Sequence, residues 1–180
     1  MKHDLEQTKK HFDDAENLDL LFFWGHTENK NHVTKACLSQ WYESDFAIND
    51  IIYFTAEHYM MAEKAKLFNN IEIHDEILIT KKQGKVKELG RQITNFKQEV
   101  WDAYKYKIVV EGNLHKFKQN EKLKTFLLNT KNQILVEASP VDNIWGIGLT
   151  AENQDAKNPY LWQGENLLGF ALMEVRDLLK

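Results

Sequence analysis

Cysteine is almost absent from this chain of 180 residues, and that absence sets the first limits. Cys37 is alone, which excludes an internal disulfide and any cysteine-rich zinc site. The seven histidines form no HxxxH or HxH pair with the spacing that a helix or strand needs to bind a metal ion. The sequence therefore predicts no metal site.

Long hydrophobic runs are also missing. No apolar stretch approaches the length of about 18 residues that a membrane-spanning helix requires. The N-terminal residues are too charged for a signal peptide, so we expect a cytoplasmic protein without membrane association. The formal net charge of −4 gives no general attraction to nucleic acid or to an acidic membrane. Any contact with nucleic acid is therefore expected to be local.

Several motifs of catalysis and cofactor binding are absent as well. The chain has no GxSxG, no Walker loop and no thiol near an evident base. Gly146 and Gly148 form a GxG pair that permits close backbone approach to a ligand, but the GxxG continuation of a dinucleotide-binding fold does not follow. No cofactor is predicted.

Aromatic residues, in contrast, are abundant. They make up 12% of the chain and include five tryptophans that are spread along it, so no local repeat explains them. Large aromatic side chains usually fill a core, and a minority form stacking surfaces for bases or sugars. Trp101 and Trp145 are the candidates for such stacking.

A length of 180 residues with 43% hydrophobic residues predicts one domain with a sizeable core.

Hydrophobic periodicity and turn residues predict a mixture of short strands and helices. Strands are expected at 18–25, where the run looks buried, at 36–42, at 134–139 and within 46–54, where Asn49-Asp50 would form a hairpin turn. Helices are expected at 55–68, 73–80 and 120–130. A further helix is expected from an Asn95 cap to Gly112, with an apolar stripe made of Phe96, Val100, Tyr104 and Ile108.

The remaining segments are assigned by composition. Residues 26–35 and 141–148 are expected to be loops, and residues 82–91 a loop with a short helix. Residues 1–17 are charged and predict a frayed arm or a short surface helix. A last helix follows residues 159–164 and has Asn166 in its first turn, where backbone N–H groups could hold an anion.

The helix expected at 55–68 carries two opposite charges in its apolar stripe. At about 100° per residue, Glu57 and Lys64 fall in one sector, with Tyr59 and Ala62 on the opposite side. Thr55 is the expected N-cap. Because burial of an unpaired charge is costly, the two side chains are expected to pair or to share a polar cleft. Alternatively, both lie at the border of the stripe and reach water.

The chemically capable groups suit a reaction at a sugar carbon. Glu57, Lys64 and Asp142 are the main candidates, with Glu137 as a further one. Cleavage of a glycosidic bond needs a carboxylate to stabilise or attack an oxocarbenium-like centre and an acid to help the leaving group. A lysine in an apolar site can stay partly neutral and form a Schiff base with the sugar. Arg91 either grips a phosphate or is simply solvated.

Long motifs in the chain resemble the YbiA-like family, also called NADAR. The two longest are TAEHYMMAEKA at 55–65 and DNIWGIGL at 142–149. Shorter matches follow in the same order as in the family, from about residue 22 to residue 176, and lie at 38–41, 89–91, 101, 116–117, 127–130, 136–139, 162–169 and 173–176.

The resemblance implies a compact, single-domain, mainly α (α+β) fold with a few short strands, spanning residues 18–180 and leaving residues 1–17 as an N-terminal arm. It also implies an N-glycosidase. Family activities include hydrolysis of phosphorylated ribosylamino-pyrimidines of the riboflavin pathway and removal of ADP-ribose from modified guanine. The matched motifs transfer Glu57, Trp101 and Asp142 as the site group, with Lys64 as the residue that contacts the ribose or forms an imine.

The expected substrate-binding residues are Arg91 for phosphate and Trp101 or Trp145 for the ribose or base, together with Gly146, Gly148 and Asn166. The expected partner is a small phosphorylated ribosyl compound or an ADP-ribose adduct, with nucleic acid only as a modified substrate. Two readings of other classes stay open: a non-catalytic module that binds ADP-ribose or a nucleotide, and a structural interaction protein.

Overall fold

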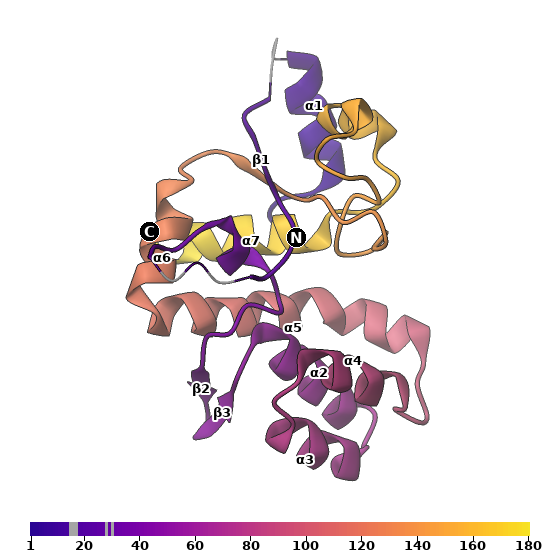
Figure 1. Ribbon diagram of the computed structural model, residues 1–180. Helices are drawn as coiled ribbons and strands as arrows, with labels where there is room; N and C mark the ends of the chain where they lie inside the picture. Colours follow the sequence, from indigo (N-terminus) through magenta and orange to yellow (C-terminus); the bar gives the residue numbers. More distant parts are fainter. Residues whose placement is uncertain (15–17, 28, 30) are drawn as a thin grey trace. The chain divides into compact units, whose positions relative to one another are not determined.

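The computed structural model describes residues 1–14, 18–27, 29 and 31–180 (Figure 1). The chain divides into two compact units, and each is described by itself. Unit 1 comprises Met1–Ser39 and Lys122–Lys180, and unit 2 comprises Gln40–Glu121. The elements of unit 1 are α1 (Leu5–Asp14), β1 (Leu20–Phe23), η1 (Lys35–Leu38), α6 (Glu121–Asn129), β4 (Ile134–Glu137), η2 (Gln154–Lys157), η3 (Pro159–Leu161) and α7 (Leu167–Leu178). Those of unit 2 are β2 (Phe46–Ile48), β3 (Ile51–Tyr53), α2 (Ala56–Leu67), α3 (Ile71–Ile79), α4 (Gln83–Arg91) and α5 (Gln98–Gln119). The predicted mainly helical fold with a few short strands is confirmed.

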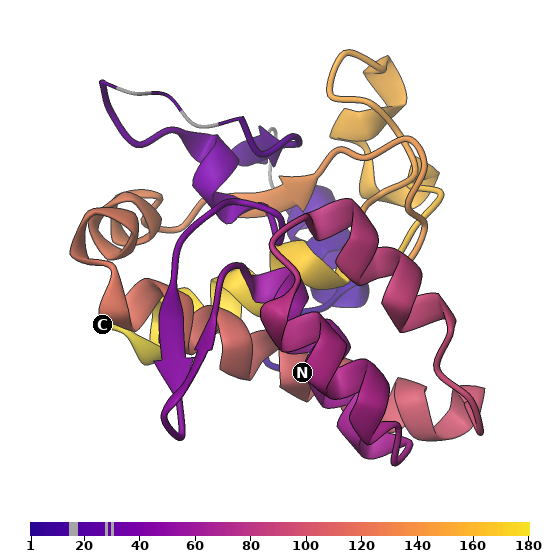
Figure 2. The same ribbon diagram turned by 60° about the horizontal axis from the view of Figure 1, so that its bottom comes forward.

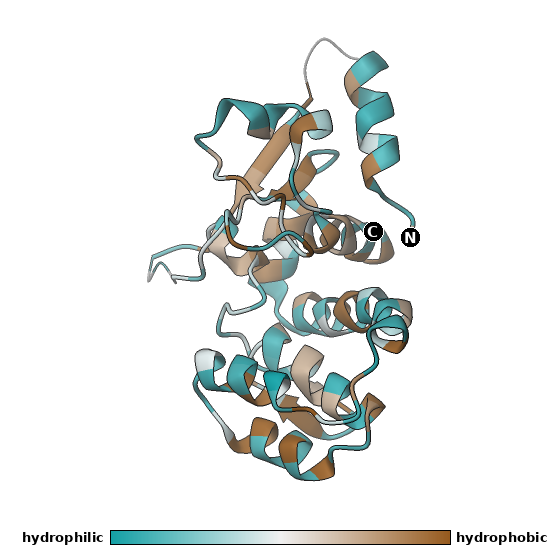
Figure 3. Ribbon diagram, turned by 90° about the vertical axis from the view of Figure 1, so that its right-hand side faces the viewer, coloured by the Kyte–Doolittle hydropathy of each residue, from teal (hydrophilic) through white to brown (hydrophobic). Residues whose placement is uncertain are grey.

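The core of unit 1 is built on two parallel strands. β1 and β4 pair from Leu20 opposite Ile134 to Phe23 opposite Glu137, and α7 packs against β4. In Figure 3 both strands are coloured as hydrophobic, whereas α1 is mostly hydrophilic. The predicted strands at 18–25 and 134–139 are confirmed. The first is less buried than expected, because Phe23 is its buried residue and Trp24 is 58% exposed.

The N-terminal residues form helix α1, which packs on η3 within unit 1. The ring centroids of Phe12 and Tyr160 lie 6.2 Å apart, and the Tyr160 hydroxyl donates a hydrogen bond of 2.7 Å to Asp13. The predicted arm is therefore a surface helix over residues 5–14, and residues 15–17 lie outside the described part of the chain. The domain boundary predicted at residue 18 stays a prediction.

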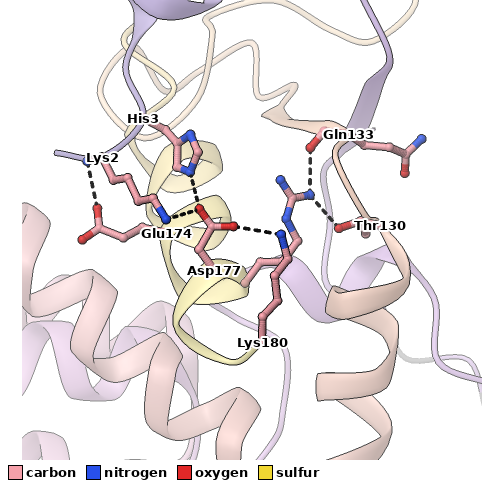
Figure 4. A network of polar contacts seen from close by, with 8 residues as sticks. Lys2, His3, Thr130, Gln133, Glu174, Asp177 and Lys180 are labelled. Atoms are coloured by element: carbon pink, nitrogen blue, oxygen red, sulfur yellow. Dashed lines mark hydrogen bonds and ion pairs between the residues drawn. The ribbon is translucent and has the colours of Figure 1, made fainter.

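A polar cluster joins the chain start to α7 (Figure 4). Lys2 Nζ and His3 Nε2 lie 2.7 and 2.9 Å from the Asp177 carboxylate, and Lys180 Nζ lies 3.1 Å from its other oxygen. Burial raises the pKa of Asp177, but hydrogen bonds from Lys2, His3 and Lys180 outweigh it and leave the pKa below its usual range. Both ends of the described chain are thus tied to one helix.

Arg176 on the buried side of α7 anchors the turn between α6 and β4. Its Nη1 donates hydrogen bonds of 2.8 Å to Thr130 Oγ1 and to the carbonyl of Gln133 (Figure 4). Burial lowers the pKa of Arg176, while Asp177 raises it. The guanidinium therefore serves as a structural donor to the turn that follows α6, in addition to the hydrogen bonds that this turn makes within itself.

Unit 2 is arranged around α2, which contacts β3, α3, α4 and α5. The β2–β3 hairpin precedes α2 (Figure 2). Asn49 and Asp50 at its turn have φ of 50° and 65°, the left-handed values that a two-residue hairpin requires. Thr55 caps α2 by accepting a hydrogen bond of 3.3 Å from the His58 N–H. The predicted hairpin, helix and cap are confirmed.

The expected division of α2 into an apolar and an exposed side is wrong. Tyr59 and Ala62, which were expected opposite Glu57, are 3% and 0% exposed. The reason is that three helices pack around α2, so nearly all of its first three turns is covered. The two charges therefore lie in the interior of a helix cluster rather than on one stripe.

Three other predictions need correction. Residues 36–42 form no strand, because Thr34 caps the 3-10 helix η1 and places Cys37 and Leu38 side by side in the core. Residues 83–91 are helical throughout. The stripe predicted from Phe96 to Gly112 has the wrong phase: α5 begins at Gln98 and continues to Gln119, and Tyr104 is 51% exposed. The buried face lies one residue further on, at Trp101, Lys105, Val109, Gly112, Asn113 and Lys116.

Within the described ranges, no helix is both long enough and apolar enough to cross a membrane.

Candidate active site

Lys64 in α2 lies among groups that suit a cation. Its Nζ donates a hydrogen bond of 3.1 Å to the carbonyl of Gly90 at the end of α4. The same Nζ is 4.6 Å from the ring centroid of Phe96 and 5.5 Å from that of Trp101. Both distances are within the range of cation–π attraction. The half-buried ammonium is thus held by one carbonyl and two aromatic faces.

The charge state of Lys64 depends on two opposed effects. Burial lowers the pKa of Lys64, and the carboxylate of Glu57 on the same helix raises it. Burial is the larger effect, so the pKa is lowered overall. A lowered pKa increases the neutral amine fraction at a given pH, which is the form able to attack a carbon atom. Burial thus outweighs the effect of Glu57 on the pKa of Lys64, and the catalytic role of this lysine stays a prediction.

Glu57 is 4% exposed and lies in the first turn of α2. Its backbone N–H donates a hydrogen bond of 3.0 Å to the carbonyl of Gln40. The N-terminal end of a helix favours a carboxylate, because the backbone dipoles and free N–H groups there are positive. The start of α2 thus fixes where the Glu57 side chain leaves the backbone.

His58 secures the same turn. Its Nε2 lies 2.8 Å from the carbonyl of Thr80, and its Nδ1 lies 2.7 Å from Thr55 Oγ1. Because a carbonyl oxygen can only accept, Nε2 carries the proton and Nδ1 accepts from the Thr55 hydroxyl. Burial lowers the pKa of His58, although the Thr80 carbonyl, Asp45 and Glu43 raise it. His58 is therefore a neutral structural residue beside Glu57.

Arg91 follows Gly90 directly and is exposed at the end of α4. Among the described residues it makes no ion pair, so its guanidinium is available to a phosphate. Gly90 allows α4 to pack closely against α2, because a Cβ at that position would overlap the side chain of Met61 in α2. The absence of a side chain at Gly90 brings α4 close enough for its carbonyl to reach Lys64.

The structure brings four of the predicted site residues into unit 2, namely Glu57, Lys64, Arg91 and Trp101. The other five, which are Asp142, Trp145, Gly146, Gly148 and Asn166, belong to unit 1.

In unit 1, Asp142 shapes the loop that follows β4. Its Oδ1 accepts hydrogen bonds of 2.9 Å from the Ile144 N–H and 2.8 Å from the Trp145 N–H. This is the pattern by which an aspartate fixes a turn through its own side chain. Trp145 is half-buried in the same turn. Their roles in catalysis and substrate binding stay predictions.

The glycines and Asn166 have structural tasks in unit 1. A Cβ at Gly146 would lie 2.8 Å from the carbonyl oxygen of Glu137, and Gly148 has φ of 70°. Asn166 is fully buried, donates to the Leu135 carbonyl at 2.9 Å and accepts from the Glu137 N–H at 3.0 Å. The sequence suggested that these glycines allow a ligand to approach closely, but the atoms that lie closest to them belong to other residues of unit 1. A direct role of the three residues in substrate binding stays a prediction.

Sequence reasoning missed two parts of the Lys64 environment. Phe96 was assigned to a helix stripe, but it precedes α5 and packs against Phe68, with ring centroids 5.1 Å apart. The Gly90 carbonyl carries no signal in the sequence, because every residue has one. The only sequence feature near this carbonyl was the matched motif at 89–91, which contains Gly90.

Comparison with known proteins identifies the group to which this site belongs. A family model described as NADAR domain matches residues 22–180. The chain belongs to the NADAR family. N-glycosidase R617 of Acanthamoeba polyphaga mimivirus is 45% identical to this NADAR chain over 157 residues, which cover 84% of the chain and 92% of that protein. N-glycosidase Npun_R5314 of Nostoc punctiforme is 31% identical over 144 residues, or 80% and 85% of the two chains.

A solved structure shows the same fold. The NMR structure of the E. coli protein YbiA matches this NADAR chain with a TM-score of 0.72 over 90% of the chain and 86% of YbiA, at 23% identity. The predicted family and fold are thereby confirmed. The protein is accordingly an N-glycosidase of the NADAR family, a hydrolase of N-glycosyl bonds.

Proposed function

We propose that this NADAR N-glycosidase hydrolyses the bond between a phosphorylated ribose and the nitrogen of a heterocyclic base. The proposed substrate is a ribosylamino-pyrimidine phosphate of the riboflavin pathway, and the products are ribose 5-phosphate and the free aminopyrimidine. The observation that carries the proposal is the setting of Lys64, a half-buried amine that donates to the Gly90 carbonyl, lies over the Phe96 and Trp101 rings and is close in the chain to the exposed Arg91. Burial also lowers the pKa of Lys64. A small phosphorylated sugar can be held beside it by Arg91.

The proposed binding mode uses groups adjacent to Lys64. Arg91 is one residue from the carbonyl that accepts the Lys64 hydrogen bond, and it is exposed to an incoming phosphate. Trp101 and Phe96 present aromatic faces to the Lys64 ammonium. In the proposed complex the ribose or base packs against Phe96, which is 39% exposed, and reaches Trp101 only through the 8% of that residue that is exposed. C1′ then lies near Lys64 and Glu57.

Two chemical routes fit these residues. In the first, the C1′–N bond breaks and its electron pair leaves with the base, which takes a proton. Glu57 stabilises the oxocarbenium-like centre and then accepts a proton from the water that adds to C1′. Water supplies the hydroxyl at C1′ and the proton that the base gains, so the products equal substrate plus one water.

In the second route, the neutral Lys64 amine attacks C1′ and displaces the base with the electrons of the C1′–N bond. The bond between C1′ and the ring oxygen then opens, that oxygen takes a proton, and a C1′=N imine forms. Water adds to the imine, expels the Lys64 amine and releases the ribose. Glu57 transfers the protons in these steps. The lowered pKa of Lys64 favours this route, because the attacking amine must be neutral.

A second candidate substrate is ADP-ribose attached to guanine in nucleic acid. It is favoured by a locally basic segment around α4, which contains five exposed basic residues and one exposed acidic residue. The cations are Lys81, Lys82, Lys85, Lys87 and Arg91, and the acid is Glu88. A module that only binds ADP-ribose would not require a half-buried lysine with a lowered pKa, so the setting of Lys64 counts against that function.

The test is a mass-spectrometric assay with both substrates, each with and without borohydride. We expect cleavage of the ribosylamino-pyrimidine phosphate and, in the imine route, a reduced sugar adduct on Lys64. Lys64→Met serves as the matched blank, because it removes the amine and keeps a flexible, unbranched side chain. Cleavage of ADP-ribosylated guanine DNA alone would select the second candidate. Tight ADP-ribose binding without cleavage of either substrate would contradict catalysis.

A further inference from the structure

The buried face of α5 contains an amide that the proposed mechanism does not use. Asn113 is 0% exposed, and its Nδ2 donates hydrogen bonds of 2.8 Å to the side-chain oxygen of Gln40 and to the carbonyl of Val109. Gln40 is 7% exposed, and its own Nε2 lies 3.9 Å from the sulfur of Met60. Two amide side chains are thus paired inside unit 2.

This pair is poorly suited to stabilising the fold. Asn113 Oδ1 is buried and has no hydrogen-bond partner among the described residues, and the Met60 sulfur is a weak acceptor for Gln40. A buried polar atom without a partner costs free energy, whereas apolar replacement of both members of a buried pair can be nearly neutral or stabilising. Leucine and methionine have nearly the shapes of asparagine and glutamine. Stability alone therefore does not account for the two amides.

The pair does connect directly to Glu57. The carbonyl of Gln40 accepts the hydrogen bond of 3.0 Å from the Glu57 N–H. Gln40 lies in a turn, outside any helix or strand, so no regular backbone ladder fixes the direction of its carbonyl. The hydrogen bond from Asn113 to the Gln40 side chain supplies that anchor. A connected path therefore runs from α5 through Gln40 to the first turn of α2.

We infer that Asn113 and Gln40 are positioning residues for Glu57: Asn113 holds the Gln40 side chain, and the Gln40 carbonyl then fixes the backbone from which Glu57 projects. The inference rests on the proposed function of Glu57. Neither amide is assigned a contact with the substrate. A displacement of about 1 Å in a catalytic group can cost on the order of 10²-fold in rate, so even a small movement of this turn is measurable.

The test compares Asn113→Leu, Gln40→Met and the double variant with the wild type. We expect kcat on the ribosylamino-pyrimidine phosphate to fall by about 10-fold to 10²-fold in each, with KM nearly unchanged. The melting temperature should fall in each single variant, because the remaining buried amide loses its partner, and should recover in the double variant. The double variant should be no slower than the slower single variant, because the two amides act as one path.

Gln119→Met is the matched control. Gln119 is exposed, and its side chain exchanges hydrogen bonds of 2.7 and 2.9 Å with the backbone of Ala47 in β2; its hydrogen bonds in the described part of the chain do not involve Gln40 or Glu57. We expect its kcat to equal that of the wild type. A normal kcat in Asn113→Leu together with a lowered melting temperature would show that the amides are merely structural.

A second readout requires no substrate. Because the Glu57 carboxylate raises the pKa of Lys64, that pKa reports where the carboxylate lies. Titration of the Lys64 ε-carbon by NMR, assigned with Lys64→Met, should give a lower pKa in Asn113→Leu than in the wild type and in Gln119→Met. An unchanged Lys64 pKa would overturn the inference. Absence of turnover in the wild type would count against the proposed function alone.

Discussion

At the scale of single residues, we expect substitution of Lys64 to have the largest effect on turnover. Replacing it by methionine removes the amine but keeps a flexible side chain that packs well against the Phe96 and Trp101 rings. We therefore expect Lys64→Met to fold normally, with an equal or higher melting temperature, and to lose at least ~10³-fold in kcat. Lys66→Met is the control, since Lys66 is exposed on the same helix and 3.4 Å from Glu63. Near-normal turnover in Lys64→Met would contradict both proposed roles.

Glu57 is expected to act as the proton-transferring partner of Lys64. Glu57→Gln keeps the size of the buried side chain and removes its charge, so kcat should fall by at least ~10²-fold. Glu63→Gln on the same helix provides the control, and its kcat should match the wild type. A loss confined to KM in Glu57→Gln would indicate that Glu57 only binds the substrate.

The residue scale also shows what the sequence could and could not predict. Glu57 and Lys64 stand out in the sequence because charged residues are rare inside an apolar pattern, and the structure places both in one unit with Arg91 and Trp101. Phe96 was assigned to the wrong environment, because four-residue spacing matched it to a helix that begins two residues later. Asn113 could not be recognised from the sequence, because most asparagines are exposed and the residue type alone does not show which one is buried.

At the scale of elements, the packing of α5 on α2 depends on Gly112. A Cβ at this position would collide with the ring of Tyr59, which is itself fixed by contacts with Phe46 and Tyr53. We expect Gly112→Ala to destabilise the protein by roughly 1–3 kcal/mol, because a rigid ring cannot move aside without displacing its neighbours. Urea unfolding measures the change.

Gly84→Ala in α4 is the matched control for Gly112→Ala. Nothing lies within 4 Å of a Cβ at Gly84, and the position is helical. The substitution should stabilise the protein by about 0.5–1 kcal/mol through the higher helix propensity of alanine. Changes of the same sign in the two variants would contradict the packing role of Gly112.

The start of α2 is expected to be sensitive to acid through His58. In the folded protein burial lowers the pKa of His58, whereas in the unfolded chain the pKa is about 6.5. Below pH ~6.5 the unfolded state therefore binds more protons than the folded state, so the free energy of unfolding falls as the pH drops and levels off below the folded pKa. Above pH ~7 this contribution is constant.

Urea unfolding from pH 5 to pH 8 checks this prediction in the wild type and in His58→Gln. The variant should be less stable at pH 7 by ~1–3 kcal/mol, because it loses buried hydrogen bonds. It should also show a smaller decrease between pH 7 and pH 5. Equal decreases in the two proteins would show that His58 does not cause the acid sensitivity.

Among the elements, those with a strong local signal were predicted correctly. The Asn49-Asp50 turn and the Thr55 cap are each specified by residues within a few positions of one another. The phase of α5 and the burial of α2 on all sides depend instead on which helices pack against them. Those contacts join residues far apart in the sequence, such as Gly112 with Tyr59, and no local pattern encodes them.

At the scale of the whole molecule, net charge and local charge have opposite signs. The chain carries 23 Lys and Arg against 27 Asp and Glu, giving −4, yet the exposed segment around α4 is basic and ends at Arg91. An acidic protein gains little from general attraction to a polyanion, whereas one exposed arginine beside Lys64 suffices for a single phosphate. The charge distribution therefore favours a small phosphorylated substrate.

Salt dependence separates the two substrate classes. One phosphate contact through Arg91 should lower kcat/KM by no more than about fourfold between about 50 and 200 mM salt, whereas the 6 to 10 contacts of a nucleic-acid site would lower it by ~10³–10⁵-fold. We expect the smaller decrease, and we expect Arg91→Gln to remove most of it while raising KM. Lys180→Gln, which alters an exposed cation beyond the end of α7, should keep the wild-type dependence. A decrease of several orders of magnitude would instead show that the basic segment around α4 binds a polyanion, and the substrate would then be modified nucleic acid.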